Sequence, residues 1–231
     1  MVAILSATSF LLRSAQKPTN ILQVQTGATE VESAKRANAD KRELTSIEDR
    51  KKRRFILDGK VQEDSMRKIC ERIIEINADD ESRKERDSSY VPLPIEIIVN
   101  TYGGSLYDAF MLVGVMDTSD TPIHTYCHGK AMSAGFLIFS AGHKRFATEQ
   151  ATFMYHNASV GMHNDLQNLQ EDLDHYKRLM GRYDDYIVKV TNIERSFLDD
   201  VKSSKDTKYM TALEAHEVGL VDEMLYRKQD K

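Results

Sequence analysis

The apolar positions of this chain follow two different periods, and these periods predict most of its secondary structure. Short apolar runs that stop at a glycine or a turn are typical of buried strands, and they lie at 53–61, 95–100 and 121–129. After two of these runs, apolar residues recur at helical spacing, which predicts helices at 63–77 and 106–117. The first half of the chain therefore alternates between strands and helices.

The second half of the chain continues this alternation. A further helix is predicted after Ser133, and short strands are expected within 143–157. From 164 to 191, apolar residues recur at helical spacing, which predicts a long amphipathic helix that either packs on its own domain or makes subunit contacts. The segment 211–225 predicts a closing helix, a glycine stop and a last short strand. In contrast, the polar segment 78–94 has the composition of an exposed loop.

Strands that alternate with helices predict an α/β fold, with a largely parallel sheet covered by helices. The alternation indicates one domain at 53–226, preceded by an extension at 1–52 and followed by a tail at 227–231. The extension ends in the charged run "EDRKKRRF", which is typical of a solvated segment, and it has no acidic residue before Glu30. We expect a flexible or removable extension, with an organellar targeting segment as the alternative.

Composition and charge narrow the class of protein. Hydrophobic residues make up 41% of the chain and charged residues 29%, which suits a globular protein with a substantial core. The net charge of −4 gives no reason to expect nucleic acid or an anionic membrane as partner. Cys70 and Cys127 are too few for a disulfide framework and indicate a reducing compartment, the cytoplasm or an organelle matrix. No apolar run approaches the roughly 20 residues that span a bilayer.

Two junctions of a strand, a turn and a helix carry the residues most suited to chemistry. They are "VNTYGGSL", with Gly103 and Gly104, and "CHGKAMSAGF", with Ser133. Each places backbone N–H groups at a helix N-terminus, where the first donors lack partners within the helix and negative charge is favoured. An oxyanion hole for acyl transfer needs such fixed donors. A plain tight turn is nevertheless the more ordinary reason for a Gly-Gly pair.

Ser133 becomes a candidate nucleophile when it is considered together with His156. A serine hydroxyl needs a base to remove its proton, and His156 follows the apolar run "TFMY", where a chain leaves the edge of a sheet. Both residues lie at the ends of elements, where the sites of α/β sheets collect. A metal site is not expected, because the spacing within one strand puts His124 and His128 on one face and Cys127 on the other.

Four motifs, in a fixed order, resemble the ClpP family of serine peptidases, the proteolytic subunit of the Clp protease. The motifs are "NTYGGSLYDAF", "GKAMSAGFLIFSAG", "FMYHN" and "YMTALEAHEVGLVDEML", and the resemblance extends from about Arg54 to Leu225. Each motif alone is loose, but four motifs in order at family-like spacing are specific. The resemblance implies the ClpP/crotonase-like fold, with repeated β-β-α units and a protruding long helix.

The resemblance also implies roles for particular residues. Ser133 is the nucleophile, His156 is the general base, and the backbone amides of Gly104 and Ala134 form the oxyanion hole. The implied reaction is attack on a peptide carbonyl, formation of an acyl-enzyme, and hydrolysis of that intermediate by water.

Three further positions follow from the same resemblance. Gly103 and Ser105, on the Gly-Gly turn, are expected to bind substrate. The family has an acid shortly before the closing motif, and an ungapped count from "YMTA" reaches Thr207. Asp206, one residue earlier, is the candidate that orients His156, with Thr207 or a backbone group as the alternative.

The implied function is that of a serine endopeptidase. It cleaves unfolded proteins or peptides inside a chamber of two stacked heptameric rings, which meet through the long helix. No cofactor is expected in the subunit, and ATP enters only through an AAA+ unfoldase partner. Glu96 and Ile98 stand where many members carry aromatic residues that dock this partner, so the partnership is left open.

Three other functions remain as alternatives. One is a virus-type member that cleaves capsid or scaffold proteins. Another is a non-catalytic subunit of a mixed ring, although such a subunit has no chemical need of Ser133 and His156. The third is acyl-CoA chemistry on a related fold, as in relatives of enoyl-CoA hydratase, which use two backbone amides without a Ser–His pair.

Overall fold

The computed structural model describes residues 35, 47–157, 166–204 and 206–227. Contacts divide the chain into two units, Met1–Glu48 and Asp49–Lys231, and all elements named below belong to the second. Most of the predicted extension at 1–52 and of the tail at 227–231 lies outside the described residues, as does the start of the long helix predicted at 164–191.

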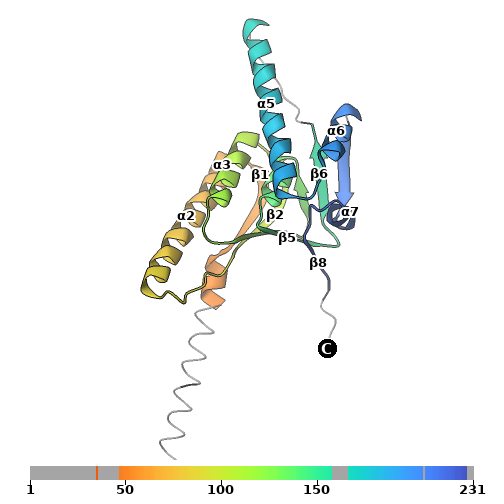
Figure 1. Cartoon of the computed structure of the whole chain (residues 1–231). Coiled ribbons are helices and arrows are strands. Elements are labelled where there is room, and N and C mark those ends of the chain that lie inside the picture. Colours follow the sequence, from red (N-terminus) through yellow and green to blue (C-terminus); the bar gives the residue numbers. More distant parts are fainter. Residues whose placement is uncertain (1–34, 36–46, 158–165, 205, 228–231) are drawn as a thin grey trace, which may run out of the picture. The chain divides into compact units, whose positions relative to one another are not determined.

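Strands and helices follow one another along this unit, as the pattern predicted (Figure 1). The strands are β1 (Arg54–Val61), β2 (Ile95–Gly104), β3 (Ile123–Cys127), β4 (Lys130–Met132), β5 (Lys144–Thr148), β6 (Thr152–His156), β7 (Thr207–Thr211) and β8 (Glu223–Leu225). The helices are α2 (Glu63–Arg86), α3 (Leu106–Asp117), α4 (Ala134–Ser140), α5 (Leu166–Val190), α6 (Arg195–Ser204) and α7 (Ala212–Glu217).

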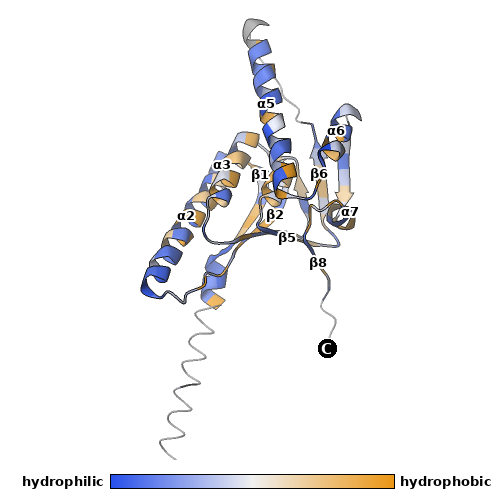
Figure 2. Cartoon of the chain, viewed as in Figure 1, coloured by the Kyte–Doolittle hydropathy of each residue, from blue (hydrophilic) through white to orange (hydrophobic). Residues whose placement is uncertain are grey.

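The strands in the described residues form a single sheet in the order β7-β6-β4-β2-β3-β5-β8, with β1 also paired to β2. Every pair is parallel except β6 with β7. The predicted, largely parallel sheet is therefore confirmed, with one antiparallel pair at its edge. Helix α5 projects well beyond the sheet (Figure 1), and its outer part is mainly hydrophilic (Figure 2).

Strand β2 changes partner along its length, from β3 to β4. This change brings the ends of β2, β4 and β6 together. Residues 95–98 of β2 pair with β3, whereas Thr101 pairs with β4. Strand β4 pairs in turn with β6, through contacts such as that of Met132 with Met154. Because β2, β4 and β6 are parallel neighbours, their carboxyl ends meet at one edge of the sheet, where α/β proteins bind their ligands.

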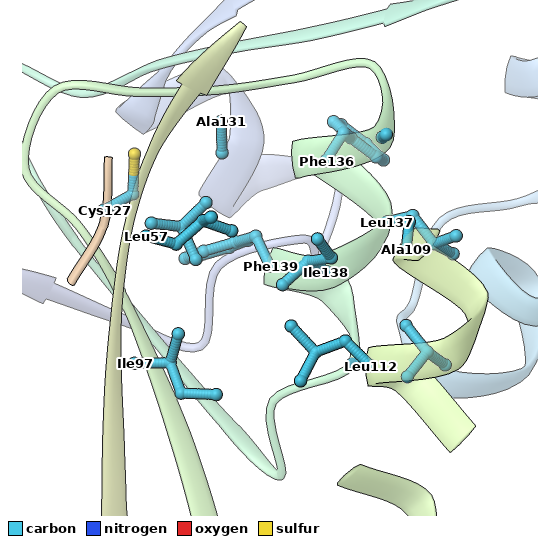
Figure 3. Packing of buried hydrophobic residues seen from close by; sticks show 14 of the residues in the cluster. Leu57, Ile97, Ala109, Leu112, Cys127, Ala131, Phe136, Leu137, Ile138 and Phe139 are labelled. Carbon is cyan, nitrogen blue, oxygen red and sulfur yellow. The ribbon is translucent and has the colours of Figure 1, made fainter. Parts of the chain in front are cut away.

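Helix α4 is a core helix because its sequence is apolar almost throughout. All of its residues are buried, as expected for a helix that is hydrophobic on every side. Figure 3 shows its residues 136–139 among Leu57 and Ile97 of the sheet and Leu112 of α3. A helix packed in this way fixes the residue that precedes it, which is Ser133.

The predicted loop at 78–94 is wrong in its first half, because helix α2 continues to Arg86. The charged residues in this stretch support the helix instead of ending it. Arg83 forms an ion pair with Asp79, four residues earlier on the same helix. No glycine or proline interrupts the stretch before Arg86, so nothing in the backbone forces the helix to stop.

Asp80 explains why this polar part of α2 also belongs to the folded core. Its side chain is 1% exposed and forms an ion pair of 2.5 Å with Arg53, and it accepts hydrogen bonds of 2.6 Å from Thr121 and Tyr90. Burial opposes ionisation of Asp80, but the hydrogen bonds from Arg53, Thr121 and Tyr90 dominate and hold its pKa below the ordinary value. The polar composition of this segment therefore gave no sign that Asp80 is buried and fixes α2 to Arg53.

Helix α6 is an element that the pattern analysis did not predict. Its buried side chains are Leu198 and Val201, which lie three residues apart on one face. Most of its other residues are polar or charged, so the apolar signal is short. The spacing of Phe197, Leu198 and Val201 is the signal by which the helix could have been found.

Candidate active site

The structure brings Ser133 and His156 together at the edge of the sheet. Ser133 lies between β4 and α4, and His156 is the last residue of β6, the strand that pairs with β4. The Nε2 atom of His156 lies 2.9 Å from the Oγ atom of Ser133, which is hydrogen-bonding distance. A serine and a base at this distance have the arrangement that activates a nucleophile.

Ser133 has an uncommon backbone conformation, with φ of 54° and ψ of −121°. Among the described residues it is the only residue other than glycine with a positive φ. Its N–H donates a hydrogen bond of 2.9 Å to the carbonyl of Met154, and its own carbonyl accepts one of 2.9 Å from the N–H of Phe136. Such strained conformations persist where surrounding contacts fix them, and they cluster at active sites.

The helix N-terminus and the Gly-Gly turn both lie beside Ser133. Ala134 is the first residue of α4, so its N–H has no partner within the helix. On the β2 side, Gly103 packs so closely that a Cβ there would lie 2.8 Å from the Cβ of Ser133. A Cβ on Gly104 would overlap the carbonyl oxygen of Val61, so only glycine fits at this position. The Gly-Gly turn is thus packed directly against the nucleophile.

These residues open onto a small cavity of about 120 Å³. The cavity combines the candidate chemical groups with apolar side chains from α3 and α5. Its lining is formed by Gly104, Leu106, Ser133, Ala134, His156, Met180 and Tyr183. Sequence patterns had assigned Met180 and Tyr183 only to the apolar face of the long helix, and nothing in their spacing distinguished a cavity wall from core packing.

The environment of His156 favours a neutral base. Burial lowers the pKa of His156 below its ordinary value, because a charged imidazolium is less well solvated in the cavity.

The two cysteines offer no competing nucleophile. Burial raises the pKa of Cys70 to about 11 and that of Cys127 to about 12, so both thiols stay protonated near neutral pH.

The other residues predicted for the site, Asp206, Thr207 and Ser105, make no hydrogen bond to the side chains of Ser133 or His156 in the described part of the chain. The register of the antiparallel pair β6 and β7 puts Thr207 opposite His156, and Asp206 precedes this strand. Within the described part of the chain, no hydrogen bond or ion pair joins His156 to Asp206, whose role stays a prediction. Ser105 caps α3, and its hydroxyl accepts a hydrogen bond of 3.2 Å from the N–H of Asp108. The described residues contain no cluster of three metal-ligating side chains.

Comparison with known proteins decides the family. The family model described as Clp protease matches residues 38–228. The chain belongs to the Clp protease family. Members of this family are peptidases, and the mixed α/β architecture described above is consistent with their fold. The match also covers both strand–turn–helix junctions and His156.

Two relatives resemble this member of the Clp protease family at low identity. It is 28% identical over 184 residues to the ATP-dependent Clp protease proteolytic subunit 1 of Prochlorococcus marinus, covering 78% of this chain and 87% of the relative. It is 26% identical over 181 residues to the proteolytic subunit 2 of Corynebacterium diphtheriae, covering 78% and 85%. No helix in the described ranges is long and apolar enough to cross a membrane.

Proposed function

We propose that this protein is a serine endopeptidase. The observation that carries the proposal is the 2.9 Å contact between Ser133 Oγ and His156 Nε2, in a cavity that Gly104 and Ala134 also line. Membership in the Clp protease family supports peptide bonds as the substrate. The apolar side chains of Leu106 and Met180 in the cavity wall favour an apolar residue before the cleaved bond.

The arrangement supports the following chemistry. His156 Nε2 takes the proton of Ser133 while the serine oxygen attacks the peptide carbonyl, and the N–H groups of Gly104 and Ala134 stabilise the negative oxygen. The tetrahedral intermediate collapses, the C–N bond breaks, and the proton passes from His156 to the leaving amine. Water, deprotonated by His156, then hydrolyses the acyl-enzyme and frees Ser133. No cofactor takes part in these steps.

Covalent labelling tests this proposal directly. A fluorophosphonate probe is expected to modify one residue per chain, Ser133, because among the described serines it is the one with a histidine at its hydroxyl, and the proposed donors stabilise the tetrahedral adduct. Peptide mapping by mass spectrometry locates the adduct, which is expected to disappear in Ser133→Ala and to persist in the control Ser203→Ala, an exposed serine of α6. A folded wild-type protein that is not labelled would contradict the proposal and would favour a non-catalytic subunit.

We also propose that subunits assemble into stacked heptameric rings around a chamber, as the family resemblance implies. Support comes from α5, which projects beyond the sheet and exposes Leu173, an apolar residue that is 41% accessible in the isolated chain. Light scattering is expected to give a mass many times that of the 26.4 kDa subunit, and Leu173→Glu is expected to lower it. A fully active monomer would contradict this assembly.

We propose that ATP is used by a partner, an AAA+ unfoldase, and not by this subunit. The registers align Ile56, Ile98, Tyr126 and Phe146 in one row across β1, β2, β3 and β5, and Ile56 is 65% exposed. The accessible part of this row, which excludes the buried Phe146, is the surface on which an AAA+ unfoldase would dock, despite Glu96 and Ile98 at the positions of the family's aromatic residues. The two buried free cysteines fit a reducing compartment such as the cytoplasm.

A further inference from the structure

Helix α5 contacts Ser133 and the neighbour of His156 through two successive residues, Tyr183 and Asp184. Tyr183 is 3% exposed and Asp184 is fully buried, so both contacts are made inside the protein. One contact reaches the backbone of Ser133, and the other reaches Tyr155, the residue immediately before His156. Neither residue was singled out by its sequence, because both lie within the regular pattern of a long amphipathic helix.

Tyr183 adds a side-chain anchor to the strained turn at Ser133. Its hydroxyl donates a hydrogen bond of 3.2 Å to the Ser133 carbonyl, whereas the Ser133 N–H is bound to Met154 of β6. Burial raises the pKa of Tyr183, so the hydroxyl keeps the proton that it donates. The backbone of Ser133 is therefore held at both of its peptide bonds, by β6 through the N–H and by α5 through the carbonyl.

Tyr155 is fixed in an equivalent way on the strand that carries His156. Its hydroxyl donates a hydrogen bond of 2.7 Å to Asp184, and its ring stacks on that of Tyr183 with centroids 5.7 Å apart. Lys202 of α6 forms an ion pair with the same carboxylate, and Arg195 approaches it at 3.6 Å. Because these cations balance its charge, the buried Asp184 carboxylate can stay ionised and accept the hydrogen bond from Tyr155.

We propose that Tyr183 and Tyr155 are positioning residues, which hold Ser133 and His156 at hydrogen-bonding distance through their hydroxyl contacts, that of Tyr183 to the Ser133 carbonyl and that of Tyr155 to Asp184 of α5. The inference rests on the proposed serine mechanism and names the residues that orient its two partners. It matters here because His156 Nδ1 has no hydrogen-bond partner among the described residues, so none of the described carboxylates orients the ring. The orientation then depends on how β6 and the Ser133 turn are held.

The test removes one hydroxyl at a time. Tyr183→Phe and Tyr155→Phe keep the stacked rings and delete only the hydrogen bonds to Ser133 and to Asp184. Misplacement of catalytic groups by about 1 Å costs on the order of 100-fold in rate. We therefore expect kcat and the rate of fluorophosphonate labelling to fall at least about tenfold, with KM unchanged, because substrate binding does not use either hydroxyl.

Tyr186→Phe is the matched control, since it removes a hydroxyl from the same helix that is bound at 2.6 Å to Asp117 of α3, away from the cavity. It is expected to keep the kcat of the wild type, and melting temperatures show whether all three variants lose similar stability. If the wild type is labelled and Tyr183→Phe and Tyr155→Phe react at its rate, the positioning role is refuted while the serine mechanism stands. A fall in kcat that the control shares would equally refute it, and an unlabelled wild type would refute the serine mechanism itself.

Discussion

His156→Ala is expected to lower kcat by a factor on the order of 10⁶, close to the loss caused by removing the nucleophile itself. The 2.9 Å contact puts Nε2 where the proposed mechanism needs the acceptor of the Ser133 proton, and no other titratable side chain among the described residues lines the cavity apart from the buried Tyr183. Hydrolysis of a fluorogenic peptide with an apolar residue before the cleaved bond measures the loss. His128→Ala, at an exposed histidine outside the cavity lining, is the control.

The pH dependence gives a second measurement of the same role. A general base acts only when it is neutral, so kcat/KM rises with pH as His156 loses its proton. Because burial lowers the pKa of His156, the midpoint of this acid limb is expected below the value of about 6.5 of a free histidine. Activity that survives in His156→Ala, or a midpoint above that value, would contradict the assignment.

Asp206→Asn belongs in the same series, because it tests the third position of the proposed mechanism. Where an aspartate fixes the tautomer of the histidine, its replacement by asparagine costs about 10⁴-fold in kcat. Catalytic hydrogen bonds are often formed only when substrate is bound. Asp206 is therefore tested even though no hydrogen bond joins it to His156 in the described residues. An unchanged kcat would leave Ser133 and His156 as a dyad oriented by the surrounding fold.

The strand–helix alternation could be predicted because each element carries its own period of apolar residues. The pattern could not predict where α2 ends, because the charged residues of 78–86 have the composition of a loop. A tertiary contact also holds this part of the helix in the fold, the buried ion pair of Asp80 with Arg53, 27 positions away in sequence. Local composition contains no information about a partner at that distance.

In the candidate site too, some residues could be predicted from the local sequence, whereas others depend on contacts between distant segments. Ser133 and the Gly-Gly turn were found because each lies at a junction with its own local signature. The ungapped count reaches Thr207, which the register of β6 and β7 also puts opposite His156. Counting alone could not choose between Thr207 and Asp206 as the third residue, because it contains no information on how the two strands pair. The small residue Gly135 has a packing role, because a Cβ there would overlap the side chain of Thr101 on β2.

Gly104→Ala is expected to lower kcat by about 10²- to 10³-fold, the loss that follows from removal of one donor of an oxyanion hole. Gly104 has a φ of 153°, and a Cβ there would overlap the carbonyl oxygen of Val61 at the end of β1. We expect the overlap to force β1 and the turn apart, and so to move the Gly104 N–H away from the position proposed for the oxyanion. Fluorophosphonate labelling is expected to slow as well, since the tetrahedral adduct needs the same donors.

The control for Gly104→Ala is Gly114→Ala in α3, where an added Cβ meets no atom within 4 Å. Alanine in the interior of a helix is more stable than glycine by about 0.5–1 kcal/mol, so this variant is expected to raise the melting temperature and keep kcat. Gly104→Ala is expected to lose stability as well as activity. Labelling of the folded fraction at a temperature well below its melting point separates the two effects, because only a displaced donor slows the reaction of a folded site. If the folded fraction of Gly104→Ala reacts at the rate of the wild type, the amide of Gly104 is not part of the oxyanion hole, and the donors must come from the N-terminus of α4 alone.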